Sequence, residues 1–158
     1  DNHLEDIIGE IDWSWRYLLM RRHTAGHLLD HCLSEVCGEY LKTLDSWLGD
    51  HCYVSYRGEV PQEDEIKKAE KMENELIKQG RPVSIEHVCF EELLRRSPNA
   101  PNIFRLPKLE KYRIVTIQGF EPIPCGGTHL KNINEVGRFK IVKVIPNSGS
   151  FRVYYDVY

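Results

Sequence analysis

The sequence predicts one α+β domain, in which a long N-terminal helix and further helices pack on a largely antiparallel sheet. Helical periodicity and capping residues dominate the first half of the chain, whereas β-branched and aromatic runs dominate the second half. The 158 residues are 41% hydrophobic and 28% charged, which is typical of an ordinary globular domain. We therefore expect residues 1–158 to form a single domain. The chain begins with Asp1 and not Met, which also fits a domain cut from a longer protein.

The first half reads as two helices with short elements after each. Asp12 or Ser14 caps a helix that runs to about Val36 and stops near Gly38. A short polar-apolar continuation follows at residues 41–48. The remaining predicted elements are a strand at 53–56, a helix opened by Pro61 in its first turn and ended by Gly80, a strand at 83–88 and a short helix at 90–96.

The second half reads as strands separated by loops. A loop at residues 97–102 precedes four predicted strands, at 113–117, 120–123, 139–145 and 151–155. The last two strands are joined by a hairpin turn at 146–149. The segment from Cys125 to His129 therefore lies in a loop between strands.

Composition argues against several classes of protein. No apolar run is long enough to span a bilayer, and the start shows no signal-peptide pattern. Five cysteines without regular spacing fit a reducing compartment, so we expect a cytoplasmic protein.

Charge gives a mixed indication about nucleic acid. The net charge of −3 opposes binding, because Lys and Arg normally make the phosphate contacts. The acidic residues, however, crowd residues 63–75, and basic residues flank the two motifs described below. These basic residues are Arg16, Arg21, Arg22, Lys108, Lys111, Arg113, Lys131, Arg138, Lys140 and Lys143. Each of them, taken singly, is equally well explained as a solvated surface charge.

The first motif is a histidine pair on the long helix. His23 and His27 are four residues apart, so both imidazoles lie on one helix face and can reach one metal ion. They lie outside the apolar arc of the same helix, which argues against core filling. That arc contains Leu18, Ala25, Leu28, Leu29, Cys32 and Val36. Thr24 stands where a metalloprotease of the HExxH type needs its glutamate, so peptide hydrolysis by that mechanism is not expected.

The second motif supplies a thiolate and a third imidazole. Cys125 and His129 are again four residues apart, and the intervening Gly126 and Gly127 indicate a tight loop. The two motifs together form a Cys-His₃ set suited to zinc, made of His23, His27, Cys125 and His129. His31 shares the histidine face and competes as a ligand. The remaining cysteines are better explained as small apolar residues; these are Cys32, Cys37, Cys52 and Cys89.

The paired motifs, His23-Thr24-Ala25-Gly26-His27 and Cys125-Gly126-Gly127-Thr128-His129, resemble the signature of alanyl-tRNA synthetase editing domains and of the AlaX trans-editing proteins. The flanking segments also resemble that family, at residues 9–13, 16–21, 131–132, 135–137 and 139–141. Two departures bear on substrate selectivity. Synthetase editing domains commonly carry threonine where this chain has Gly26, which predicts extra room, and their Gln-containing strand has no clear match at residues 51–57.

The resemblance implies the same fold class and a zinc-dependent hydrolase that deacylates mischarged tRNA(Ala) in trans. Seryl-tRNA(Ala) is the first expected substrate and glycyl-tRNA(Ala) the second. A pocket that bonds the serine hydroxyl would reject alanine by roughly 10⁴–10⁵-fold. We nominate Thr24 for that contact, with Thr128 and the backbone of Gly126 and Gly127 near the ester; the sequence identifies no group that orients water.

A non-catalytic module is the alternative. In it the zinc is structural, and the domain binds RNA or another protein. Four protein ligands favour this alternative, because they close a tetrahedral site, whereas catalytic zinc usually keeps one position open.

Overall fold

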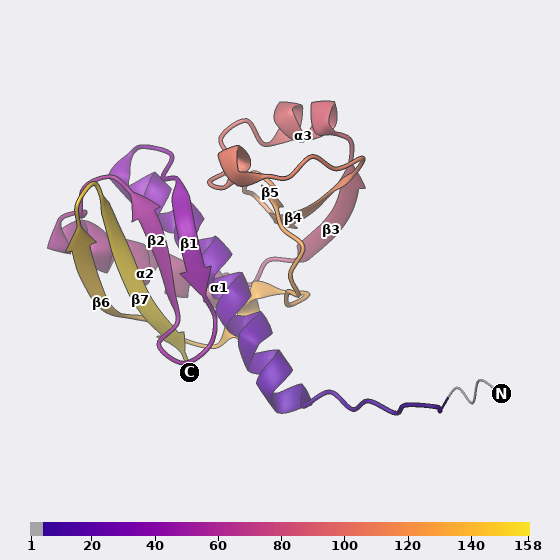
Figure 1. The fold of residues 1–158 in the computed structure, drawn as a ribbon. Coiled ribbons are helices and arrows are strands. Elements are labelled where there is room, and N and C mark those ends of the chain that lie inside the picture. The colour runs from indigo at the N-terminus through magenta and orange to yellow at the C-terminus, as the bar shows by residue number, and fades with distance from the viewer. Residues whose placement is uncertain (1–4) are drawn as a thin grey trace.

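The computed structural model describes residues 5–158, which form three α-helices and two antiparallel sheets (Figure 1). The helices are α1 (Trp13–Cys37), α2 (Glu63–Gln79) and α3 (Phe90–Arg96). The strands are β1 (Thr43–Trp47), β2 (Tyr53–Arg57), β3 (Val83–Val88), β4 (Tyr112–Ile117), β5 (Ile123–Pro124), β6 (Phe139–Asn147) and β7 (Ser150–Val157). Two short 3₁₀ helices are η1 (Ile103–Arg105) and η2 (Ile133–Val136). The α+β class is confirmed, with two sheets where one was expected.

Helix α1 begins and ends where its capping residues predict. The Asp12 side chain accepts a hydrogen bond from the Trp15 backbone N–H, which identifies Asp12 and not Ser14 as the N-cap. At the other end Gly38 adopts a left-handed conformation with φ 71°, and its N–H bonds to carbonyls of the last turn. The predicted motif helix is therefore confirmed.

The main core lies between α1, α2 and the four-stranded sheet. The strand order is β1-β2-β7-β6, and all neighbours are antiparallel. Strand β7 alternates strictly, because Phe151, Val153, Tyr155 and Val157 are buried and the residues between them are not. Since α1 packs against this core, the position of the histidine face is fixed relative to the sheet.

The three-stranded sheet carries the second motif. Its order is β3-β4-β5, and α3 lies against it around a small core of Leu93, Tyr112 and Ile114 (Figure 1). Strand β5 leads directly into the loop that begins at Cys125. The two halves of the predicted metal site thus come from different parts of the fold.

Two predicted elements are corrected by the structure. Residues 41–48 do not continue the helix but contain β1, because the left-handed Gly38 stops α1 and the next residues pair with β2. The predicted strand at 120–123 shrinks to β5, Ile123–Pro124. Gly119 turns the chain with φ 93°, and Phe120 lies in that turn with its ring stacked on His31, 4.6 Å between centroids.

The other predicted elements are confirmed with small changes of boundary. The hairpin turn after β6, the strands at 53–56 and 83–88 and the helix at 90–96 all form where expected. Pro61, however, precedes the N-cap Gln62 and does not lie in the first turn of α2. Among residues 5–158, all five cysteines are free. No helix in that range has the length and apolar character needed to cross a bilayer.

Candidate metal centre

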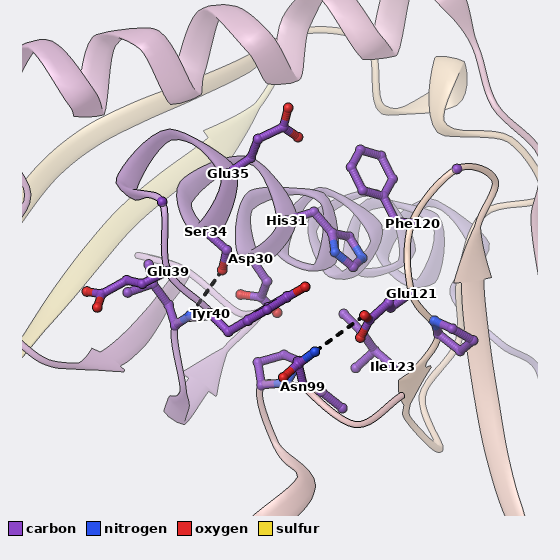
Figure 2. A pocket seen from close by; sticks show the side chains of 16 residues that line it. Asp30, His31, Ser34, Glu35, Glu39, Tyr40, Asn99, Phe120, Glu121 and Ile123 are labelled. Carbon is purple, nitrogen blue, oxygen red and sulfur yellow. Dashed lines mark hydrogen bonds between the residues drawn. The ribbon is translucent and has the colours of Figure 1, made fainter. Parts of the chain in front are cut away.

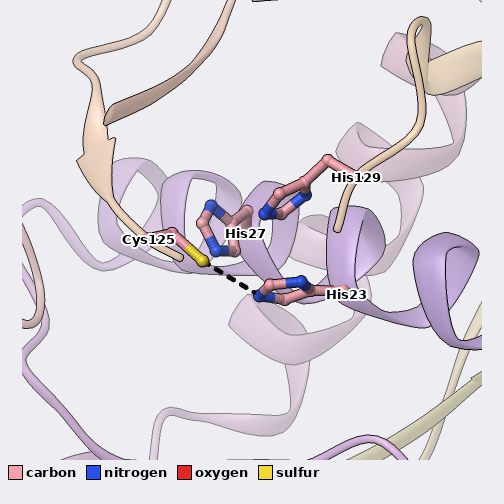
Figure 3. Close-up of side chains that lie close together, drawn as sticks. All are labelled: His23, His27, Cys125 and His129. Atoms are coloured by element: carbon pink, nitrogen blue, oxygen red, sulfur yellow. Dashed lines mark hydrogen bonds between the residues drawn. The ribbon is translucent and has the colours of Figure 1, made fainter. Parts of the chain in front are cut away.

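Four side chains from the two sequence motifs converge at one place (Figure 3). The nearest ligand atoms of His23, His27, Cys125 and His129 all lie within 4.8 Å of one another. The Sγ atom of Cys125 is 3.3 Å from Nε2 of His23. Tetrahedral zinc with Zn–N and Zn–S bonds of about 2.0 and 2.3 Å requires ligand separations of about 3.3–3.5 Å. The cluster therefore has the composition and approximate spacing of a metal-binding site.

Hydrogen bonds orient two of the imidazoles toward the centre of the cluster. Nδ1 of His23 donates to the carbonyl oxygen of Thr128 at 3.0 Å, which leaves Nε2 free to act as a ligand. Nδ1 of His129 is 3.1 Å from the Thr24 hydroxyl. Nε2 of His129 is buried and has no hydrogen-bond partner among the described residues. A buried nitrogen left unpaired in this way fits a coordinate bond to a metal ion.

Burial gives the imidazoles the protonation state that metal ligands need. Loss of solvation lowers the pKa of His23, His27 and His129, and for His27 the neighbouring imidazoles lower it further. These side chains are therefore neutral at pH 7. Burial raises the pKa of the Cys125 thiol, partly offset by the Gly127 N–H and the positive charge of Arg113. A metal cation would supply the charge that stabilises the thiolate.

The Cys-Gly-Gly loop is held by Arg113 of β4. Its Nη1 donates to the carbonyl oxygens of Cys125 at 2.8 Å and Gly127 at 2.7 Å. The Gly127 N–H in turn donates to Cys125 Sγ at 3.4 Å. A Cβ atom at Gly127 would collide with the His23 ring, so glycine allows the loop to approach the helix closely.

The residues nominated for substrate contact occupy different environments. Gly126 and Thr128 are exposed, whereas Gly127 is half-buried under His23. Thr24 is fully buried, and its hydroxyl accepts from the Leu130 N–H at 3.1 Å in addition to its contact with His129. Thr24 thus ties the two motifs together. A contact between Thr24 and a substrate hydroxyl stays a prediction.

Gly26 does not leave the extra room that the sequence suggested. A Cβ atom at this position would lie only 2.7 Å from the Tyr155 hydroxyl oxygen and 3.7 Å from Val54. Tyr155 is buried, and its hydroxyl donates to the Arg22 carbonyl at 2.8 Å. An aromatic residue of β7 therefore fills the space that a side chain at position 26 would need.

A cavity of about 140 Å³ adjoins the cluster, lined by three of the four ligands, His23, His27 and Cys125. Asp30 is the carboxylate among its lining residues, and its side chain is 8% exposed. The Tyr56 hydroxyl donates to Asp30 Oδ1 at 2.5 Å. Burial raises the pKa of Asp30 to about 7, against the lowering effects of Tyr56 and Arg105. The cavity thus holds a carboxyl group that can exchange a proton near neutral pH.

A larger cavity of about 420 Å³ also has Asp30 in its lining (Figure 2). Its lining includes four carboxylates and neither Lys nor Arg; the four are Asp30, Glu35, Glu39 and Glu121. His31 lines this cavity and stacks on Phe120, so it does not belong to the four-ligand cluster. The acidic lining makes this cavity unfavourable for phosphate groups.

Several basic residues near the motifs make internal contacts. Arg22 is buried and pairs with Asp156 at 3.1 Å, and Arg21 donates to the Val136 carbonyl at 2.7 Å. Arg113 holds the Cys-Gly-Gly loop. These three charges therefore stabilise the fold around the cluster. Lys131, by contrast, is exposed.

Sequence reasoning missed Asp30 and the aromatic partner that holds it. Asp30 follows His27 by three residues, so helical periodicity places both on one face of α1. That spacing was a usable signal. Tyr56 could not be found in this way, because only the packing of β2 against α1 brings it to Asp30.

Comparison with known proteins relates the chain to aminoacyl-tRNA synthetases and editing proteins. The family model described as "Threonyl and Alanyl tRNA synthetase second additional domain" matches residues 112–154, which include Cys125 and His129. The alanyl-tRNA editing protein AlaX-M of Methanosarcina barkeri is 34% identical over 154 residues, which cover 96% of this chain and 63% of that protein. AlaX-M of Methanosarcina acetivorans is 33% identical over 152 residues, covering 94% and 61%.

A region of alanine–tRNA ligases matches as well. The enzyme of Thermoplasma acidophilum is 36% identical over 149 residues, covering 87% of this chain but 16% of the ligase. The chain thus spans somewhat under two thirds of the AlaX-M relatives and a small part of the ligases. These matches extend over nearly the whole chain and agree with the paired motifs. Over nearly its whole length, this chain is therefore similar to AlaX-M editing proteins and to a region of alanine–tRNA ligases.

Proposed function

We propose that this chain is a zinc-dependent hydrolase that deacylates mischarged tRNA(Ala). The observation that carries the proposal is the convergence of His23, His27, Cys125 and His129 beside a small cavity. The relatives named as alanyl-tRNA editing proteins supply the substrate class. Zinc is the metal of choice because one thiolate and three imidazoles form a borderline-soft tetrahedral donor set.

Ester hydrolysis at this site would use the metal ion and a general base in different roles. Zinc, when bound, would polarise a carbonyl oxygen or lower the pKa of a water molecule. Asp30 is our candidate for the general base, since it lines the cavity and its pKa is raised to about 7 by burial. It takes a proton as the water oxygen attacks the ester carbonyl, and returns the proton to the ribose oxygen as the ester C–O bond breaks.

Serine is the first proposed amino acid and glycine the second. The cavity of about 140 Å³ suits a small side chain, and Tyr155 rather than a residue at position 26 limits its size. Alanine is smaller than serine, so size alone cannot spare the correct ester. Selectivity needs a polar group that bonds the serine hydroxyl and is left without a partner when alanine binds. The proposed contacts for this hydroxyl and for the ester are Thr24, Thr128 and the backbone of Gly126 and Gly127.

We also propose that residues 1–158 act as one editing domain. Helix α1 and the loop after β5 each supply half of the ligands, so neither half alone would hold the metal.

A structural-zinc module is the second candidate, and the four protein ligands favour it. Two observations support the hydrolase over the module. Three of the four ligands, His23, His27 and Cys125, line a cavity, and Cys125 and His23 are only partly buried.

Deacylation of seryl-, glycyl- and alanyl-tRNA(Ala) by the metal-loaded protein, with and without chelator, tests the proposal. We expect release of serine, slower release of glycine and little release of alanine, all lost with chelator. Metal binding without release of any amino acid would favour the structural module.

A further inference from the structure

An exposed aromatic ring on η1 is surrounded by positive charge. Phe104 is 45% exposed, although it is a large apolar side chain. The Lys42 ammonium lies 5.8 Å from its ring centroid, and the guanidinium carbons of Arg57 and Arg105 lie at 5.2 and 6.0 Å. These four residues come from three separate segments of the chain and are called the Phe104 patch below.

Among the described residues, the charges of the Phe104 patch form no ion pair with a carboxylate. Among residues 5–158, none of the ion pairs includes Lys42, Arg57 or Arg105. On α2, by contrast, Lys67 and Lys71 pair with glutamates one turn away. Three cations around one ring, none in an ion pair with a described residue, form a local positive field in a chain whose net charge is −3.

A second aromatic cluster, around Arg152, differs from the Phe104 patch because its cation has hydrogen-bond and ion-pair partners. On the outer face of the four-stranded sheet, Arg152 lies 3.8 Å from the Tyr53 ring centroid. It also donates to Ser55 Oγ and the Tyr154 hydroxyl, and it pairs with Asp45 at 3.7 Å. Arg152 has hydrogen-bond and ion-pair partners, whereas among residues 5–158 the Lys42 and Arg57 side chains contact the Phe104 ring but form no ion pair.

The Phe104 patch leads into the candidate active-site cavity. Arg105 belongs to the patch and also lines the cavity beside the ligand cluster. Its position is fixed by hydrogen bonds to the Leu44 carbonyl and, at 2.8 Å, to Thr43 Oγ1. The larger cavity, which shares Asp30 with this one, has an acidic lining. We therefore expect a polyanion to be attracted to the site over Phe104 and repelled by the acidic lining of the larger cavity.

We propose that the Phe104 patch binds the single-stranded 3′ end of the tRNA, with a base stacked on the Phe104 ring and phosphates on Lys42 and Arg57. This inference rests on the proposed function, because it takes the RNA to be the carrier of the ester. Aromatic rings flanked by cations bind single strands by stacking and phosphate neutralisation together. Arg105 then lies where the strand enters the cavity.

Binding of RNA that carries no amino acid tests the inference without requiring hydrolysis. The probes are uncharged tRNA(Ala), a short single-stranded RNA and heparin, which has the charge of a polyanion but no bases. Phe104→Ala should weaken binding of both RNAs by about 5- to 150-fold, which corresponds to loss of one stacked base. It should leave heparin binding unchanged. Lys42→Gln and Arg57→Gln should weaken binding of all three probes and reduce the salt dependence, by about 0.7 in log–log slope for each lost phosphate contact.

Matched variants separate the inference from general effects. Phe90→Ala removes a ring of similar exposure, 49%, on α3, and Lys143→Gln removes an exposed charge on β6; both should bind RNA like the wild type. Phe104→Tyr should retain the affinity, and unchanged thermal melting should show that the Ala variant is folded.

Wild-type RNA affinity in folded Phe104→Ala overturns the inference, as does an equal loss in Phe90→Ala or a loss of heparin binding alone. If RNA binding depends on Phe104 but the wild type releases no amino acid, the proposed function fails and the inference stands. If hydrolysis proceeds and Phe104→Ala binds and reacts normally, only the inference fails.

Discussion

The ligand cluster and the Phe104 patch are neighbours, and Arg105 reaches the cavity that connects them, but they are built in different ways. The cluster takes four partly or fully buried side chains from two short motifs, and hydrogen bonds between the two motifs orient the rings of His23 and His129. The patch takes exposed side chains from three segments that share no motif. Coordination needs fixed geometry, whereas attraction of a polyanion needs only charge and an accessible ring.

This difference predicts that separate substitutions can abolish hydrolysis and weaken RNA binding. Substitutions in the cluster should abolish metal binding and hydrolysis but preserve affinity for uncharged tRNA. Substitutions in the patch should do the reverse. The predictions below test this separation, beginning with the largest expected effect.

Loss of a metal ligand should have the largest effect. His27→Ala or Cys125→Ala removes one of the four converging ligand atoms, so metal content should fall well below one ion per chain. Deacylation should fall by about 10²–10³-fold or more, because an electrostatic stabiliser of the reacting carbonyl is lost. Metal analysis and a deacylation assay on the same preparations provide the measurement.

Cys37→Ser is the matched control, since Cys37 is a partly buried cysteine outside the cluster. It should keep both metal and activity. Full metal occupancy in the His27 and Cys125 variants would show that the cluster is not the metal site. Loss of affinity for uncharged tRNA in these variants would break the separation between cluster and patch.

The convergence of the four side chains could be predicted in two pairs, because helix and loop geometry relate spacing to direction. Two histidines four residues apart must share a helix face, and Gly126-Gly127 indicates the tight loop that brings Cys125 to them. The ends of α1 could also be predicted from the sequence, because Asp12 and Gly38 make local hydrogen bonds to the terminal backbone groups of the helix. Within each motif and at the ends of α1 the relevant partners lie within one or two turns, but the two motifs themselves meet across a separation of 102 residues.

The remaining features depend on contacts between distant segments. The sequence offered Arg22 as a possible phosphate contact, but its guanidinium forms an ion pair with Asp156, which is distant in the sequence. Phe120 was expected in a strand, but the turn at Gly119 places its ring on His31. The Phe104 patch forms only because strand pairing of β1 with β2 brings Lys42 and Arg57 together beside η1. Local spacing rules do not predict contacts between residues that are this far apart in the sequence.

Asp30 lines the same cavity as three of the ligands and Arg105, and its substitution should show the second-largest effect. Burial raises its pKa from 3.8 to about 7, so the folded protein binds this proton more tightly than the unfolded chain. The resulting stability is fully present below pH 3.8 and is lost as pH rises through about 7. Asp30→Asn stays neutral and still accepts from Tyr56. Its free energy of unfolding should therefore match the wild type near pH 4 and exceed it at pH 8, by on the order of 2–4 kcal/mol.

Denaturant unfolding of chelator-treated protein at several pH values gives this difference directly. Glu39→Gln, an exposed carboxylate that lines the larger cavity, should show no comparable pH-dependent gain. The Asn variant should also lose deacylation activity, because it cannot accept the proton from water. A variant that is fully active would remove Asp30 as the general base, and one without the pH-dependent gain would contradict the raised pKa.

Thr24→Val should have the smallest effect of the three, and it tests how the cluster keeps its geometry. The substitution preserves shape but leaves the Leu130 N–H without its acceptor and His129 Nδ1 without its partner. Partners that orient a metal-binding histidine typically contribute 10–100-fold, so we expect metal affinity to fall by about that factor. Deacylation should recover when excess zinc is added, whereas affinity for uncharged tRNA should not change.

A competition titration against a zinc chelator measures the affinity, and Thr116→Val is the control. The Thr116 hydroxyl is buried without a partner among the described residues, so its removal should leave zinc affinity unchanged and cost little stability. The two possible roles of Thr24 then give opposite results. Reduced zinc affinity with intact preference for serine over alanine assigns Thr24 to positioning His129. Normal zinc affinity with lost preference assigns its hydroxyl to the substrate, as the sequence motif suggested, and would require the side chain to exchange its contacts with His129 and Leu130 for one with serine.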